Sequence, residues 1–369
     1  TADKMLLRSA YRSALPRVAL RSLSSASPSS TFDSFVSPSS SSPSWSSLSD
    51  GVIRRIVGSS LVISGDLSGG VLDRCMRLYR SLPPTDRGRF MSILAKEFGV
   101  KRDEVISSAS SLVRKASESP ASESDAAFVR SLGDLERAVT PLYNSLFVSL
   151  AGQPGGMRFL FDVRSDLLSI LHAKPPNADL AALRSLDASL QSHLQTWFGA
   201  GTLQLARVTW ESSPAALLEK LIHYEAVHPM HGGFPDIKQR LIGPNRRCYA
   251  FFHSTVPDEP LVFIQVALTN AISDSVQTIL SEAPPKQDKD VFIEDEQLER
   301  ASKAAPPTTA IFYSITSTQD ALSGVSLGAF LIKRVVKEIL RDIPSVKTFS
   351  TLSPIPGFAT WLKQRLGML

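Results

Sequence analysis

Residues Ile311 to Phe358 read IFYSITSTQDALSGVSLGAFLIKRVVKEILRDIPSVKTFSTLSPIPGF. The pattern predicts four elements, a strand over Ile311–Thr316, a glycine-containing loop over Ser323–Gly328, an amphipathic helix over Ala329–Asp342 and a strand over Lys347–Leu352. A loop that leads into a helix offers free backbone N–H groups and the positive helix end to an anion. The segment therefore indicates a phosphate-binding unit, with Ser353 at the tip of its second strand.

Two β-rich runs precede this unit. Arg247–His253 reads RCYAFFH and Leu261–Leu268 reads LVFIQVAL, and a turn rich in Pro, Asp and Glu separates them. This arrangement predicts a hairpin. Between the hairpin and the phosphate-binding unit, Ser281–Pro307 is polar and rich in proline, so we expect a solvent-exposed loop there.

From Gly51 to about Ala206 the apolar residues recur at steps of three and four, which predicts helices throughout. The clearest helical runs are Val71–Leu82, Asp86–Gly99 and Asp125–Ala151. The cluster from Pro83 to Asp86 is expected to end one helix and cap the next. Since no catalytic pattern converges here, we interpret this region as a helical bundle that packs on the C-terminal part or mediates assembly.

The first fifty residues are read as a transit peptide followed by a disordered tract. Met5–Leu23 is rich in Arg, Ser and Leu and free of acids, which is typical of organellar targeting and favours mitochondrion over chloroplast; a merely disordered basic tail is the alternative. Ser24–Asp50 is a Ser/Pro tract with too few apolar residues to offset the entropy of ordering.

Composition excludes several classes of protein. The 369 residues are 43% hydrophobic and 20% charged, as in an ordinary soluble protein, and are enough for two domains. The net charge of +5 is concentrated near the N-terminus, so it does not indicate a nucleic-acid-binding surface. Cys75 and Cys248 make neither a disulfide framework nor a zinc pattern, and no apolar run is long enough to span a bilayer. We expect both cysteines to be buried thiols.

Several segments resemble the malonyl-CoA decarboxylase family. They are EAVHPM (Glu225–Met230), GPNRRCYAFFH (Gly243–His253), EPLVFIQVALT (Glu259–Thr269), IFYSI, GVSLGAFLIKRVVKE and FSTLSPIPGF, and the resemblance covers roughly residues 75 to 365. The family's catalytic domain is similar to N-acetyltransferase-type folds, whose order of hairpin, strand, pyrophosphate loop, helix and strand matches the order expected here.

The resemblance implies a set of site residues. It places the acyl-CoA contacts on Ser323, Gly324, Val325, Ser326, Leu327, Gly328 and Ala329, with Lys333 and Arg334 as nearby positive charges. It makes Ser353 the catalytic serine, whereas the pattern alone favours a serine that simply ends a strand. The family's proton-donating histidine follows this serine, but no histidine follows His253 here, so a C-terminally truncated chain is expected. We interpret Ser314 and His228 as structural.

The predicted fold class is α+β, an N-terminal helical bundle followed by an incomplete N-acetyltransferase-like (GNAT-type) domain. The expected divisions are residues 1–50, 51–206 and 207–369. The implied function is decarboxylation of malonyl-CoA to acetyl-CoA and CO2, without a metal or organic cofactor. The implied protein is a homo-oligomer assembled through the helical domain in the mitochondrial matrix, with peroxisome or cytoplasm open for other forms. An inactive acyl-CoA-binding or regulatory protein and an acetyltransferase remain alternative functions.

Overall fold

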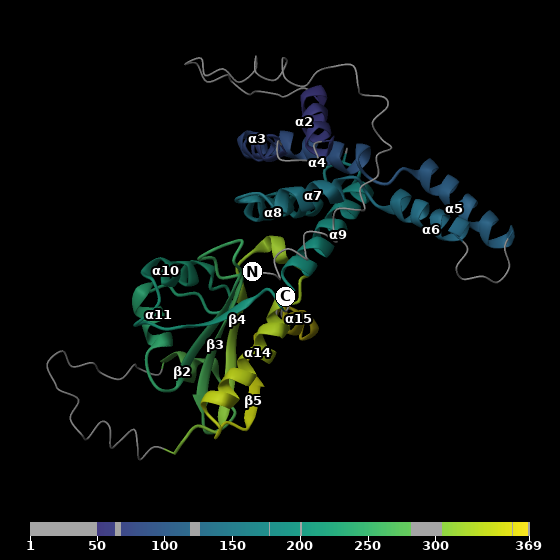
Figure 1. Cartoon of the computed structure of the whole chain (residues 1–369). Coiled ribbons are helices and arrows are strands. Elements are labelled where there is room, and N and C mark those ends of the chain that lie inside the picture. The colour runs from purple at the N-terminus through teal and green to yellow at the C-terminus, as the bar shows by residue number, and fades with distance from the viewer. Residues whose placement is uncertain are drawn as a thin grey trace, which may run out of the picture. The chain divides into compact units, whose positions relative to one another are not determined.

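Helices α2 to α9 precede a five-stranded sheet along the chain (Figure 1). The computed structural model describes residues 50–62, 68–118, 126–176, 178–199, 201–281, 305–355 and 357–367, which fall in one unit, Leu48–Leu369. Three predicted segments lie wholly or mostly outside the described residues. They are the transit segment, the rest of the Ser/Pro tract before Asp50 and most of the polar loop Ser281–Pro307. No helix in these ranges is long and apolar enough to cross a bilayer.

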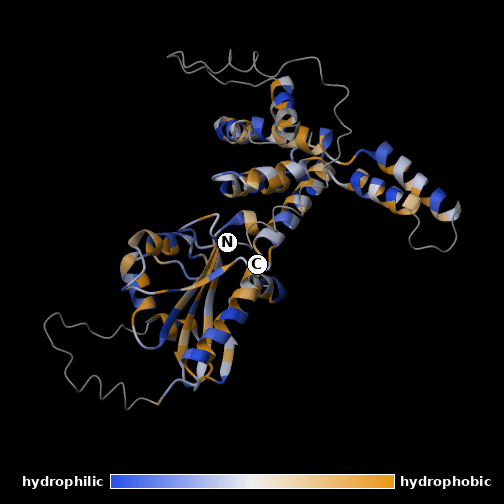
Figure 2. Cartoon of the chain, viewed as in Figure 1, coloured by the Kyte–Doolittle hydropathy of each residue, from blue (hydrophilic) through white to orange (hydrophobic). Residues whose placement is uncertain are grey.

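The helical region is confirmed for most of its predicted length. Its elements are α2 (Asp50–Val62), α3 (Ser68–Ser81), α4 (Pro84–Glu97), α5 (Arg102–Glu118), α6 (Ala126–Val139), α7 (Tyr143–Ala151), α8 (Gly156–Ala173) and α9 (Leu180–Trp197). Figure 2 shows hydrophobic and hydrophilic residues interleaved along these helices, as amphipathic helices require. On α9 the apolar face is a fully buried leucine stripe made of Leu183, Leu186, Leu190 and Leu194.

Two local predictions in this region need correction. The run Asp125–Ala151 forms two helices rather than one, because Pro141 lies between α6 and α7 and cannot donate the backbone hydrogen bond of a continuous helix. Pro84 does occupy the start of α4, but the N-cap residue is Pro83, which supplies no side-chain cap. Asp86 lies inside the first turn, buried, with its Oδ1 atom 3.0 Å from the guanidinium of Arg89.

The sheet has the strand order β1-β2-β3-β4-β5. Strands β1 to β4 pair antiparallel in succession, so β2 and β3 form the predicted hairpin, and β5 is parallel to β4. The bounds are β1 (Gln204–Val208), β2 (Arg246–Phe252), β3 (Val262–Thr269), β4 (Thr309–Ser317) and β5 (Thr348–Thr351). The helical prediction was wrong at its last residues, since β1 already runs through Ala206. The domain boundaries themselves stay predictions.

The two faces of the sheet carry different helices. Side chains alternate along a strand, so neighbouring residues of β2 face opposite ways. Cys248 and Ala250 pack in one cluster with α10 (Ala215–Tyr224) and α11 (Phe234–Leu241). Phe251 stacks on Phe330 of α14 (Leu327–Asp342), with 5.2 Å between the ring centroids. The expected order of hairpin, strand, loop, helix and strand is therefore the observed order, and the α+β class is confirmed. The short elements α12 (Val276–Ser281), η2 (Asp320–Leu322) and α15 (Phe358–Arg365) complete the described fold.

A bulge interrupts the pairing of β3 with β4. Gln265 is opposite Ser314 and Val266 is opposite Phe312, so Tyr313 is the extra residue on β4. A bulge of this kind re-aims side chains, and it explains how Tyr313 and Ser314, although adjacent, both join one polar network that contains Gln265.

Candidate functional site

The predicted phosphate loop runs from η2 into α14, which begins at Leu327, two residues earlier than predicted. Internal hydrogen bonds shape this loop: the N–H groups of Ser323 and Val325 donate to the carbonyls of Asp320 and Leu322 over 2.9 and 3.0 Å. Gly324 has φ +78°, a left-handed conformation that favours glycine. The loop is therefore a defined turn.

Two consecutive backbone N–H groups are free at the start of α14. The amides of Gly328 and Ala329 have no acceptor within the described part of the chain, and the side chain of the N-cap residue Ser326 makes no capping bond. Gly328 is partly exposed and Ala329 is exposed, so both residues lie at the surface. Two free amides at the positive end of a 16-residue helix suit an anion such as a diphosphate.

The two glycines of the loop differ in backbone conformation and in the space around them. A Cβ atom built on Gly324 would overlap the Nε2 atom of Gln191 on α9, but that side-chain end can shift, so this glycine is required by its positive φ angle. A Cβ atom on Gly328 would lie 3.6 Å from Ile315, an ordinary contact. Of the two glycines, only Gly328 lies among the free amides, and the contact of Gly324 with acyl-CoA stays a prediction.

The two basic residues of α14 differ in environment. Lys333 is exposed, whereas the guanidinium of Arg334 lies over the ring of Phe330, 5.9 Å from its centroid. Both follow the free amides within two helical turns, so both add positive charge near the candidate anion site.

Ser353 lies at the same end of the sheet as the loop, the end at which the parallel strands β4 and β5 finish. Phe312 pairs with Thr351 and accepts a hydrogen bond from the Leu352 N–H, 2.9 Å long, so β5 ends beside the middle of β4. Because β4 and β5 are parallel, the loop that follows β4 and the serine that follows β5 leave the sheet in the same direction. Ser353 is exposed, as is Ile355 at 71%. Its role as the catalytic serine stays a prediction.

The structure also contains a buried carboxylate that was not found from the sequence. Glu225 follows α10 and is only 4% exposed. Its Oε1 atom accepts the N–H groups of Val227 and His228 at 2.9 and 3.0 Å, and its Oε2 atom accepts the Gln265 side-chain amide at 2.5 Å. The Ser314 hydroxyl lies 2.9 and 2.8 Å from the two carboxylate oxygens, and that of Thr316 lies 3.3 Å from Oε1.

This network confirms two structural interpretations. Ser314 is fully buried against Glu225, so it does not line an open site. The His228 ring bonds through Nε2 to the Tyr313 carbonyl, 3.1 Å away, while its backbone turns around Glu225. His253 contacts Thr255 and the ring of Phe198, and burial lowers the pKa of His253. None of these histidines is a neighbour of Ser353 in the observed contacts of the described residues.

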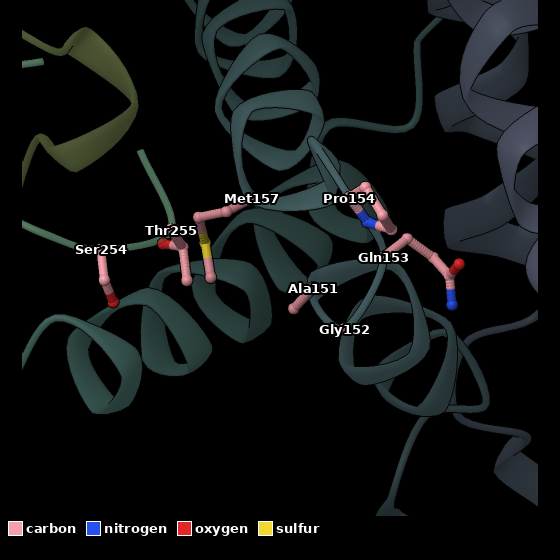
Figure 3. A pocket seen from close by; sticks show the side chains of 7 residues that line it. All are labelled: Ala151, Gly152, Gln153, Pro154, Met157, Ser254 and Thr255. Atoms are coloured by element: carbon pink, nitrogen blue, oxygen red, sulfur yellow. The ribbon is translucent and has the colours of Figure 1, made fainter. Parts of the chain in front are cut away.

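A separate cavity is lined by other residues than the predicted site (Figure 3). It measures about 390 Å³ and is lined by Ala151, Gly152, Gln153, Pro154, Met157, Ser254 and Thr255. None of the lining side chains is acidic or basic, and none belongs to the predicted site. Catalytic chemistry is therefore better sought at the end of the sheet that holds the loop and Ser353.

Comparison with known proteins agrees with this geometry. Residues 98–198 match the model of the malonyl-CoA decarboxylase N-terminal domain, and residues 201–368 match that of the C-terminal domain. The solved malonyl-CoA decarboxylase of Rhodopseudomonas palustris is 34% identical, with a TM-score of 0.68 over 87% of this chain and 70% of that chain. The chain belongs to the malonyl-CoA decarboxylase family.

Other members of the family are similar to the chain to a like degree. The structure from Agrobacterium vitis is 31% identical, with a TM-score of 0.69 over 85% of this chain and 68% of that chain. The mitochondrial malonyl-CoA decarboxylases of Anser anser anser and Rattus norvegicus are each 40% identical, over 78% and 77% of this chain. The match covers 53% of each of these two relatives, so the chain spans about half the length of the curated proteins it matches.

Proposed function

We propose that this chain binds malonyl-CoA and carries the serine part of a decarboxylase site that forms acetyl-CoA and CO2. The observation that supports this most is the pair of free amides at Gly328 and Ala329, at the same end of the sheet as Ser353. Family membership adds the substrate. In this proposal the segment Ser323–Ala329 with the amides of α14 holds the CoA diphosphate.

The chemistry asks for positioning and charge stabilisation. When the C–C bond of the malonyl group breaks, its electron pair passes to the thioester carbonyl, CO2 leaves, and the resulting enolate takes one proton at carbon. The rate rises if the carboxylate is held out of the thioester plane and the enolate oxygen receives a hydrogen bond. The neutral hydroxyl of Ser353 can do either without adding a competing charge. The resemblance assigns the proton to a histidine that follows this serine in the family.

Acetyl-CoA formation from malonyl-CoA by the 369-residue chain tests the proposal, with Ser353→Ala as the key variant and Ser254→Ala, an exposed serine at the cavity of Figure 3, as the control. Because Ser353 is exposed, its loss should leave the melting temperature and the Kd of malonyl-CoA nearly unchanged. Turnover should fall by about 100-fold or more, as when one transition-state hydrogen-bond donor is removed. Equal turnover in the two variants would refute the role of Ser353. A folded chain that binds malonyl-CoA without turning it over would be a binding protein.

We also propose that the chain forms a homo-oligomer through its helical region. Helices α5 and α6 lie side by side as a hairpin (Figure 1), and Ser131 is its only buried residue among those described. Ile106, Val113, Val129 and Leu132 are exposed, with Val113 at 65%. An apolar hairpin surface of this kind favours association. In sedimentation equilibrium, Val113→Asp should lower the oligomeric mass, whereas Ser110→Asp, an exposed control on α5, should not; equal masses would refute this interface.

We propose the mitochondrial matrix as the location of the protein. The relatives from Anser anser anser and Rattus norvegicus are named mitochondrial, and the Arg-rich, acid-free segment Met5–Leu23 has the composition of a transit peptide. Import of the 369-residue chain into isolated mitochondria tests this. A variant with Arg8, Arg12 and Arg17 changed to glutamate should not be imported. Import of both forms would refute the targeting role of this segment.

A further inference from the structure

Arg164 of α8 connects the helical region to the candidate loop. It is 1% exposed, and its guanidinium makes two different contacts. The Nε atom donates to Oδ1 of Asp187 on α9 over 2.8 Å, and Nη1 donates to the carbonyl of Ala321 in η2 over 2.6 Å. A buried guanidinium is costly unless its donors are satisfied, so this geometry is strongly specified. One satisfied donor lies in the turn that leads into the loop.

Two glutamines of α9 hold the loop itself. Asp187, Gln191 and Gln195 are spaced four residues apart, so they share one face of the helix. The Nε2 atoms of Gln191 and Gln195 lie 3.1 and 3.3 Å from the carbonyl oxygen of Gly324, to which both donate. The left-handed Gly324 thus turns its carbonyl toward α9, and the next amide, that of Val325, bonds back to Leu322.

We propose that Arg164, Gln191 and Gln195 are positioning residues for substrate binding, which hold the loop so that the free amides of α14 meet the diphosphate of the acyl-CoA. The inference rests on the proposed function. Residues 323–326 lie between η2 and α14, so their conformation sets how the chain enters the helix. A loop already held in its bound conformation avoids the entropy cost of ordering on binding. The helical region therefore contributes to affinity for substrate without touching it.

The test compares two ligands that differ in the diphosphate. Acetyl-CoA carries it, whereas S-acetylpantetheine ends before it. The main variant is the double change Gln191→Ala and Gln195→Ala, which removes two partly or fully exposed side chains and should fold normally. The matched control is Ser192→Ala with Thr196→Ala, two exposed positions of α9 next in sequence to the glutamines. Binding is measured by calorimetry on the full chain, and folding by thermal melting.

The double glutamine variant should bind acetyl-CoA about tenfold more weakly than wild type, as expected for the loss of two neutral hydrogen bonds. Its affinity for S-acetylpantetheine should be unchanged, and the control should bind both ligands like wild type. An equal loss for both ligands would indicate general loosening of the fold and would overturn the inference. Unchanged affinity for acetyl-CoA would overturn it as well.

A conservative change at Arg164 gives an independent readout. Lysine keeps the charge but lacks the planar fork that bridges a carboxylate and a carbonyl. Cooperative melting shows that the Arg164→Lys variant is folded. Its affinity for acetyl-CoA should again fall, and its affinity for S-acetylpantetheine should not. If the wild-type chain binds neither ligand, the proposed function fails and the inference falls with it. If wild type binds both ligands and the positioning variants bind them with the affinities of wild type, the inference fails while the proposed function stands.

Discussion

Replacing Glu225 by glutamine tests the buried hydrogen-bond network around this carboxylate with a change of almost no volume. The carboxylate accepts two backbone N–H groups at Oε1, and a backbone N–H cannot reverse its direction. The oxygen of the new amide must therefore stay at that position, and its NH2 group must replace Oε2. There it faces the side-chain NH2 of Gln265, which now donates to Oε2 over 2.5 Å.

The cost follows from this conflict. Either the contact with Gln265 is lost, or the Gln265 amide turns over and the Tyr313 hydroxyl, which now donates to its Oε1 atom over 3.0 Å, must accept instead. Losing a charge-assisted hydrogen bond and straining a buried donor costs about 2–4 kcal/mol. In a chain of this size that lowers the melting temperature by about 3–6 °C.

The assay is thermal unfolding followed by circular dichroism, with Glu219→Gln as the control. Glu219 is exposed on the same helix that leads to Glu225, so the same chemical change should alter stability by no more than about 0.5 kcal/mol. If Glu225→Gln melts within about 1 °C of Glu219→Gln, the network does not stabilise the sheet and the reasoning is refuted.

Three further outcomes are expected. Gly324→Ala should destabilise the fold by about 1–2 kcal/mol and weaken acetyl-CoA binding because of its positive φ, whereas Gly201→Ala, in open space, should change neither; equal melting temperatures would contradict this. Burial raises the pKa of the Cys248 thiol, and Cys75 is buried too, so a thiol reagent at pH 8 should modify neither cysteine before unfolding; rapid labelling of native protein would disagree. Burial, then the charge and hydrogen bond of Asp166, raise the pKa of Tyr79, so the fold favours the neutral phenol and stability should fall as pH rises past about 10. The stability gap between wild type and Tyr79→Phe in urea should narrow from pH 8 to 11, and a constant gap would argue against this.

Short-range pattern was enough for the elements of the phosphate-binding unit and the hairpin. Residues 311–352 alternate or repeat with clear periods, so strand, loop, helix and strand were found in the right order. Strand β1 was missed because Gln204–Val208 is short and mostly not buried, and only its pairing with β2 makes it a strand. The bulge at Tyr313 was likewise invisible, since it exists only relative to the register of β3.

The sequence by itself determined the α+β class, the glycine loop before an amphipathic helix and the serine after the last strand, because these depend on residues close together in the chain. Tertiary structure alone placed Ser353 and the loop at one end of the sheet, through the parallel pairing of β5 with β4. It also joined Glu225 to Ser314 across 89 residues and Arg164 to Ala321 across 157. Buried polar groups must find partners wherever the fold brings them, and no local pattern records which partner that will be.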